Sequence, residues 1–82
     1  MTYYILPEED YLGDNFVIEA REIKSNCIIN AIQLYLQDYC KMYDDGDYVN
    51  LFVSVEDKIG KNLLKYRAGC VIYKNYEIEE IQ

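Results

Sequence analysis

Carboxylates crowd one short stretch of this 82-residue chain, where Asp44, Asp45 and Asp47 surround Gly46. Hard cations such as Ca²⁺ and Mg²⁺ prefer several carboxylate oxygens on a flexible loop, so metal binding is the first chemistry to consider. The stretch lacks the order of acidic residues, glycine and terminal Glu that defines an EF-hand loop. We therefore interpret it as a solvated turn, and we expect no metal and no cofactor.

The usual catalytic residues are also missing. The chain contains no His, which is the commonest general base and the commonest zinc ligand. Its three Cys are widely spaced with no C-x-x-C pair, so we expect reduced thiols, with Cys40 and Cys70 in the core and Cys27 more exposed. No P-loop or G-x-G-x-x-G motif is present. The sequence therefore predicts a protein that is not an enzyme.

The elements that must position these residues fit a single domain, residues 1–82, because a second core would leave each half too small to fold. No apolar run approaches the roughly 18 residues of a membrane span. The first ten residues lack the basic start and apolar stretch of a signal peptide. We expect a cytoplasmic protein that does not bind membranes.

The first third of the chain predicts two strands. Thr2 to Leu6 is a β-prone run that Pro7 ends, and the acids up to Asp10 suit a short helical turn with Gly13 as a left-handed cap. Phe16 to Arg21 alternates apolar and polar residues, as a half-buried strand does.

The strongest pattern predicts a helix from about Ser25 to Tyr43, with Ser25 or Asn26 as its N-cap. A second apolar stripe, formed by Cys27, Ala31 and Leu34, is expected on the opposite side. The main apolar face comprises Ile28, Ile29, Ile32, Tyr35, Leu36, Tyr39, Cys40 and Tyr43.

Apolar and polar residues alternate in three segments of the second half of the chain, 48–56, 64–73 and 76–81. In the first segment, the alternate residues from Val49 to Val55 share one face. A loop containing Gly60 separates the first two segments, which favours a hairpin. An alternative is a second helix over 54–69, because Ser54 followed by Asp57 resembles a capping box and Gly69 suits a C-cap. The last segment predicts an acidic edge strand.

These elements predict an α+β fold in the order β-β-α-β-β-β, with an antiparallel sheet of four to five strands packed on one amphipathic helix. The second face of the sheet must then be wet or meet a partner. We expect it to be lined by Phe52, Lys65, Arg67, Val71 and Tyr73.

Charge points to the partner. The net charge of −7 opposes direct binding to nucleic acid and favours a protein partner with a basic surface, such as a nucleic-acid-binding nuclease. The acids form four groups at predicted turns or strand ends: Glu8–Asp10 with Asp14, Asp44–Asp47, Glu56 with Asp57, and Glu77–Glu80. Ten Tyr exceed what so small a core can bury, so several should lie on the surface and take part in binding. The candidate partner-binding residues are Asp44, Asp45, Asp47, Tyr43, Tyr48, Tyr76, Glu77, Glu79 and Glu80.

In size, charge and composition, though in no motif, the chain resembles phage-encoded inhibitors of host defence such as anti-CRISPR and anti-restriction proteins. The resemblance implies a small acidic protein-binding module that presents carboxylates where its target expects phosphates. It assigns no residue roles. The alternatives are a structural or housekeeping homodimer and, third, a small enzyme or ligand-binding protein.

Overall fold

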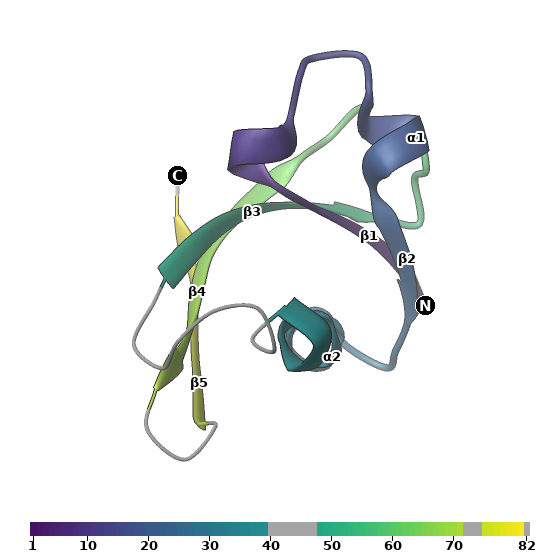
Figure 1. Ribbon diagram of the computed structural model, residues 1–82. Helices are drawn as coiled ribbons and strands as arrows, with labels where there is room; N and C mark the ends of the chain where they lie inside the picture. Colours follow the sequence, from purple (N-terminus) through teal and green to yellow (C-terminus); the bar gives the residue numbers. More distant parts are fainter. Residues whose placement is uncertain (40–47, 72–74, 82) are drawn as a thin grey trace.

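The computed structural model describes residues 1–39, 48–71 and 75–81, which form an α+β fold as predicted. Five strands form one sheet in the order β2-β1-β3-β4-β5, and every neighbouring pair is antiparallel. The sheet curves around the long helix, which lies on its concave side (Figure 1). Along the chain the elements are β1 (Thr2–Pro7), the 3₁₀ turn η1 (Glu8–Asp10), α1 (Phe16–Glu19), β2 (Arg21–Lys24), α2 (Ile28–Tyr39), β3 (Tyr48–Val55), β4 (Leu64–Val71) and β5 (Asn75–Ile81).

The main core lies between α2 and the concave face of the sheet. Alternate residues of the strands supply it, because successive side chains of a strand point to opposite faces. Each central strand contributes a pair, and α2 contributes the rest: Tyr3, Ile5, Leu51, Val53, Tyr66, Ala68, Ala31, Ile32, Tyr35 and Leu36. The described part of the chain contains no helix long and apolar enough to cross a membrane.

The helix packs through a face rotated from the predicted one. Ile29 was expected in the core but is 39% exposed, whereas Ala31, expected on the opposite side, is fully buried. The contact stripe therefore runs through Ala31, Ile32, Tyr35 and Leu36, and the small Ala31 side chain lets the helix approach the sheet closely. Of the predicted second stripe, Cys27 and Leu34 are exposed.

The helix also begins later than predicted. Its first residue is Ile28, and the Ala31 N–H donates to the Cys27 carbonyl, so neither Ser25 nor Asn26 caps it. Ser25 instead extends the β1–β2 pairing, because its N–H donates to the Met1 carbonyl and its carbonyl accepts from the Met1 amino group, both at 3.0 Å.

The strand predicted for Phe16–Arg21 is wrong. Residues Phe16–Glu19 form one helical turn, and β2 starts only at Arg21. The Asn15 carbonyl accepts the N–H groups of Ile18 and Glu19, which begins the turn. Only Phe16 of this turn is buried. Alternation over so short a segment fits a helical turn as well as a strand, and burial of one large ring decides between them.

The alternative helix over 54–69 is also wrong, because β3 and β4 form the predicted antiparallel hairpin. The residues that resembled a capping box organise its loop instead. The Ser54 hydroxyl donates to the Asp57 carbonyl, and the Asp57 carboxylate accepts the N–H groups of Ile59 at 3.0 Å and Lys61 at 2.9 Å.

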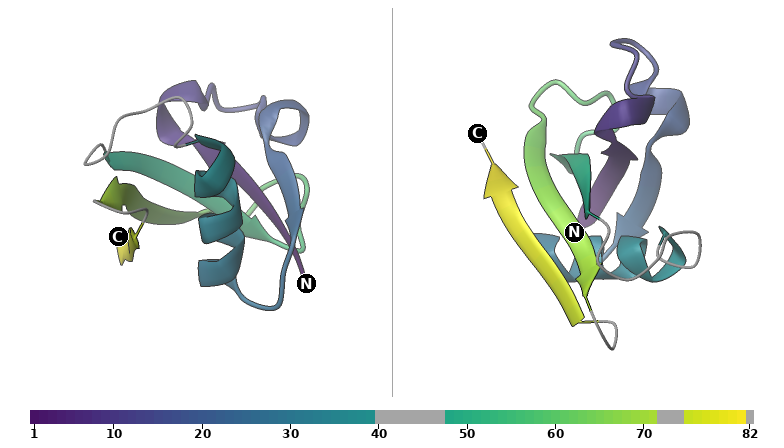
Figure 2. Two further views of the ribbon diagram at one scale, coloured as in Figure 1. Left: turned by 60° about the horizontal axis from the view of Figure 1, so that its bottom comes forward. Right: turned by 60° about the vertical axis from the view of Figure 1, so that its left-hand side comes forward.

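Residues 8–20 cover part of the convex face of the sheet; we call this segment the acidic lobe. Its Phe16 ring lies under Gly60 of the hairpin loop, where φ is +79°, and Tyr11 meets Phe52 edge to face with ring centroids 4.9 Å apart. The lobe projects beyond the strands at the top of the molecule (Figure 1; Figure 2, right). The predicted convex-face residues Phe52, Lys65 and Arg67 do alternate to this side, whereas Tyr73 and the Val71 side chain lie outside what the structure describes.

Replacing Gly60 with Ala should destabilise the fold. An added Cβ would lie 2.7 Å from Cδ1 of Phe16, so the ring or the loop must move, at a cost of about 1–3 kcal/mol beyond the backbone strain. Gly13→Ala is the matched control, because Gly13 also has positive φ, +88°, but no atom lies within 4 Å of the added carbon. Chemical denaturation of both variants should show a clearly larger decrease in the free energy of unfolding for Gly60→Ala than for Gly13→Ala. Equal losses would mean that the contact with Phe16 is not tight.

Acid should remove the contribution of Asp57 to stability. Backbone N–H groups, that of Lys61 foremost, hold the pKa of Asp57 below its ordinary value of 3.8. A carboxylate with a lowered folded-state pKa stabilises the fold above its unfolded pKa and loses that effect as pH falls through the folded value. The Asp57→Asn variant should therefore have a lower free energy of unfolding than the natural chain at pH 7. This difference between the two proteins should disappear below about pH 3.8. Denaturation at stepped pH tests this, and a gap that stays constant into acid would contradict it.

Candidate protein-binding surface

The sheet divides the predicted partner-binding residues of β5 between its two faces. Glu77 lies opposite Gly69 and Glu79 opposite Arg67 on the convex face. Tyr76 packs against the main core on the concave side. Glu80 lies opposite Tyr66 on that same side, where burial foremost, and then the charge of Glu80, raises the pKa of the Tyr66 hydroxyl. Glu77–Glu80 therefore do not form one surface, and they run along a strand rather than at a strand end as expected.

On the convex face, the predicted residues Tyr48, Glu77 and Glu79 do come together, around Arg67. The Tyr48 hydroxyl donates to the Glu77 carboxylate, and the Arg67 guanidinium lies over the Tyr48 ring, 4.1 Å from its centroid. Arg67 also pairs with Glu79 at 3.7 Å. The hydrogen bond to Glu77 is the main reason why the pKa of Tyr48 is raised. Both carboxylates thus have partners within the chain.

The remaining predicted residues, Tyr43, Asp44, Asp45 and Asp47, lie outside the described residues, as do Cys40 and the side chain of Cys70. Among the residues that are described, no group of three or more acidic or cysteine side chains could hold a metal ion. The Glu56–Asp57 pair has structural tasks, because Glu56 accepts the Thr2 N–H at 2.6 Å and Asp57 organises the hairpin loop.

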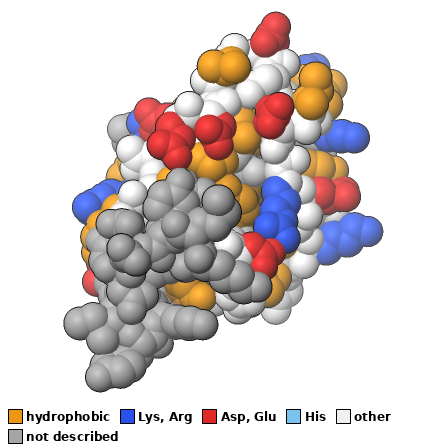
Figure 3. Space-filling view, viewed as in Figure 1, with side chains coloured by type: hydrophobic (Ala, Val, Ile, Leu, Met, Phe, Trp, Pro, Cys, Tyr) orange, Lys and Arg blue, Asp and Glu red, His pale blue; other side chains and the backbone are white. Residues whose placement is uncertain are grey.

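The acidic lobe contains the predicted group Glu8–Asp10 with Asp14, which was not among the candidate partner-binding residues, and it differs from the other groups of acids. Its five carboxylates, Glu8, Glu9, Asp10, Asp14 and Glu19, lie in a stretch where no Lys or Arg occurs before Arg21. Within the described residues, Glu8 pairs with Lys65 at 2.8 Å, but no basic side chain pairs with Asp10, Asp14 or Glu19. Figure 3 shows red side chains gathered at the top of the molecule, with orange ones between them.

Exposed apolar side chains of the lobe were missed by the sequence analysis. Leu12 is 77% exposed and Ile18 80% exposed, and Val17 beside it is also exposed. The available signal was the absence of any base from the first twenty residues together with apolar residues between the acids. It was overlooked because the alternation of Phe16 to Arg21 was interpreted as a half-buried strand.

Side-chain hydrogen bonds fix the shape of the lobe. Asn15 accepts the Leu12 N–H at 2.7 Å and donates to the Asp10 carbonyl at 2.8 Å, which closes the loop between η1 and α1. Phe16, buried beneath, anchors that loop to the hairpin loop at Gly60. The lobe therefore holds its exposed side chains on an ordered support rather than on a loose loop.

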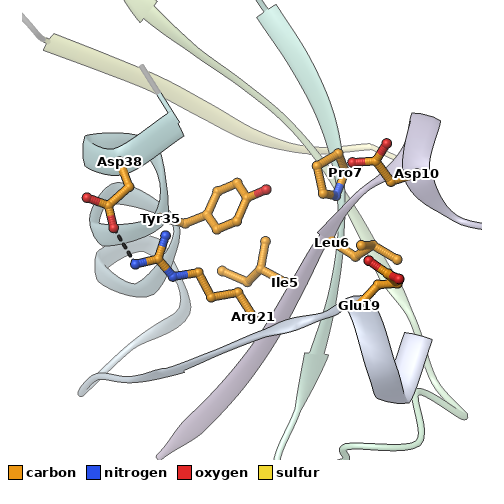
Figure 4. A pocket seen from close by; sticks show the side chains of 8 residues that line it. All are labelled: Ile5, Leu6, Pro7, Asp10, Glu19, Arg21, Tyr35 and Asp38. Carbon is orange, nitrogen blue, oxygen red and sulfur yellow. Dashed lines mark hydrogen bonds and ion pairs between the residues drawn. The ribbon is translucent and has the colours of Figure 1, made fainter. Parts of the chain in front are cut away.

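A groove of about 280 Å³ separates the lobe from α2. Figure 4 shows its aliphatic floor of Ile5, Leu6 and Pro7, with Asp10 and Glu19 on one side and the ion pair of Arg21 and Asp38 on the other; the Tyr35 ring lies between. That volume lies just below the ~300–1,000 Å³ typical of sites for drug-sized ligands. The groove has the size and lining for a single side chain that combines an aliphatic stem with a positive charge.

Comparisons with family models, with curated proteins and with solved structures found no match to this chain.

Removing the charge of Glu77 should lower the pKa of Tyr48 toward its ordinary value of 10.0, because the hydrogen bond to that carboxylate is the main cause of the shift. Glu79→Gln is the matched control and should have a smaller effect, since Glu79 acts on Tyr48 only through space. Titration of the tyrosine ring carbons by NMR measures both. Equal effects of the two substitutions would show that the hydrogen bond does not dominate.

Proposed function

We propose that this chain is a small acidic protein-binding module that docks on the basic surface of a partner protein, of the kind that nucleic-acid-binding proteins present. The carboxylates of the acidic lobe are the centre of the contact. By occupying such a surface, the module competes with the partner's nucleic acid.

The observation that carries the proposal is the uncompensated charge of the lobe. Asp10, Asp14 and Glu19 have no basic partner among the described residues, so their field extends into solvent instead of being cancelled within the chain. A field of this sign attracts a basic surface and speeds encounter with it. It repels the phosphates of nucleic acids and anionic lipids.

The acids of β5 support the same partner less well. Glu77 and Glu79 are already engaged by Tyr48 and Arg67, so a partner's bases would have to displace those contacts. The groove beside the lobe adds specificity, because a Lys or Arg side chain of the partner that enters it brings its charge to Asp10 and Glu19, which line it.

The test compares two sets of charge removals of equal size. Asp10→Asn, Asp14→Asn and Glu19→Gln together neutralise the lobe, and Glu77→Gln, Glu79→Gln and Glu80→Gln neutralise β5. Proteins captured from a lysate of the source cell by the natural chain are identified, and the affinity of the purified partner is then measured at several salt concentrations. We expect the lobe variant to lose about tenfold or more in affinity, with a slower on-rate and a flatter salt dependence. The β5 variant should change little.

A third variant, Asp44→Asn, Asp45→Asn and Asp47→Asn, tests the site predicted from sequence in the same assay. A labelled oligonucleotide bound to the partner reports competition. A partner that is not basic, or that binds all three variants like the natural chain, would refute the proposal. Sedimentation of the chain alone distinguishes the homodimer alternative.

A further inference from the structure

The most exposed aliphatic side chains of the lobe have no role in the main core. Leu12 and Ile18 each leave more than three quarters of their surface to water, and Val17 lies next to Ile18 on α1. Exposing apolar side chains singly is ordinary, but three within seven residues of an ordered lobe form a candidate contact. We call Leu12, Val17 and Ile18 the apolar tip.

The support beneath the tip is rigid. Asn15 bonds to the backbone on both sides of the loop, and Phe16 is clamped beneath Gly60. Little conformational entropy is therefore lost when a partner covers the tip, because the tip is already ordered. Side chains that are held in place before binding contribute more to affinity.

Charge around the tip selects its occupant. Three carboxylates with no basic partner among the described residues lie within two positions of an apolar side chain of the tip along the sequence: Asp10, Asp14 and Glu19. Two copies of the chain meeting through their tips would bring these like charges together at an interface, and their repulsion disfavours that contact. An anionic membrane surface would be repelled for the same reason. The occupant must carry apolar groups beside positive ones.

We propose that the apolar tip docks the apolar face of a basic amphipathic helix of the partner protein, while the flanking carboxylates pair with Lys and Arg beside that face. This inference rests on the proposed function and adds the chemistry of the segment that the module recognises. The partner helix covers Leu12, Val17 and Ile18 and so removes their surface from water.

The probe is a 14-residue synthetic helix of Leu and Lys in amphipathic order. Two matched peptides separate its features: one replaces every Leu with Gln, and one replaces every Lys with Glu. Chemical-shift changes in the isotope-labelled chain locate binding, and calorimetry gives the affinity. We expect the Leu–Lys peptide to shift residues 10–20 first, the Gln–Lys peptide to bind at least tenfold more weakly, and the Leu–Glu peptide not to bind.

Variants of the chain test the tip itself. Leu12→Ser with Ile18→Ser should weaken binding of the Leu–Lys peptide by tenfold or more. Ile59→Ser is the matched control, because Ile59 is 64% exposed in the hairpin loop, and it should stay within twofold of the natural chain. Circular dichroism and melting curves check that each variant folds.

The inference would be overturned by unchanged affinity in the double variant, by shifts spread over all acidic segments, or by equal binding of the Leu–Glu peptide. A dimer in sedimentation that the double variant abolishes would replace the partner helix with a second copy. If the captured partner needs the lobe carboxylates but not Leu12 and Ile18, the proposed function stands and this inference fails. If no basic partner is found while the peptide still binds at the tip, the tip's preference for a basic amphipathic helix stands and the proposed function fails.

Discussion

Both faces of a curved five-stranded sheet must be kept from water wherever their side chains are apolar, and the described chain has one helix of more than a single turn to do this. The long helix fills the concave side. Among the described residues, the acidic lobe covers part of the convex side over β3, and its Phe16 ring packs against the loop at Gly60. Much of the outer surface follows from this one contact, because it determines where the lobe sits and which of its side chains face outward.

The acids of this chain carry out different tasks despite their uniform sign. Glu56 and Asp57 accept hydrogen bonds from backbone N–H groups. Glu77 accepts the Tyr48 hydroxyl, and Glu79 pairs with Arg67. Surface pairs of this kind contribute little to stability, but they do cancel charge that a partner would otherwise feel. The net charge of −7 is thus a poor guide to any one face. The lobe stands apart because its acids lie where the chain offers few bases.

The sequence predicted the sheet well, but it could not show which acidic side chains have partners within the chain, for physical reasons that particular residues illustrate. The strict alternation of Tyr48–Val55 indicates a strand, and the strand pattern that follows the Gly60 loop then predicts the β3–β4 hairpin. Phe16–Glu19 is too short for its period to be unambiguous, and the deciding interaction, burial of Phe16 against Gly60, 44 residues further along the chain, is not local. The helix face was misjudged because Ile29 is more apolar than Ala31, while close packing favours the smaller residue. Clusters of charge are visible in a sequence, whereas their partners depend on strand register, as Arg67 and Glu79 show.

Among the described strands, β5 closes one side of the sheet and pairs with β4, so its other edge offers main-chain groups to any strand that comes near. Glu77, Glu79 and Glu80 place like charges along that edge, and a second copy of β5 laid against it would meet the same charges. The acidity of β5, whatever its place in recognition, thus also hinders edge-to-edge pairing between copies of this small sheet.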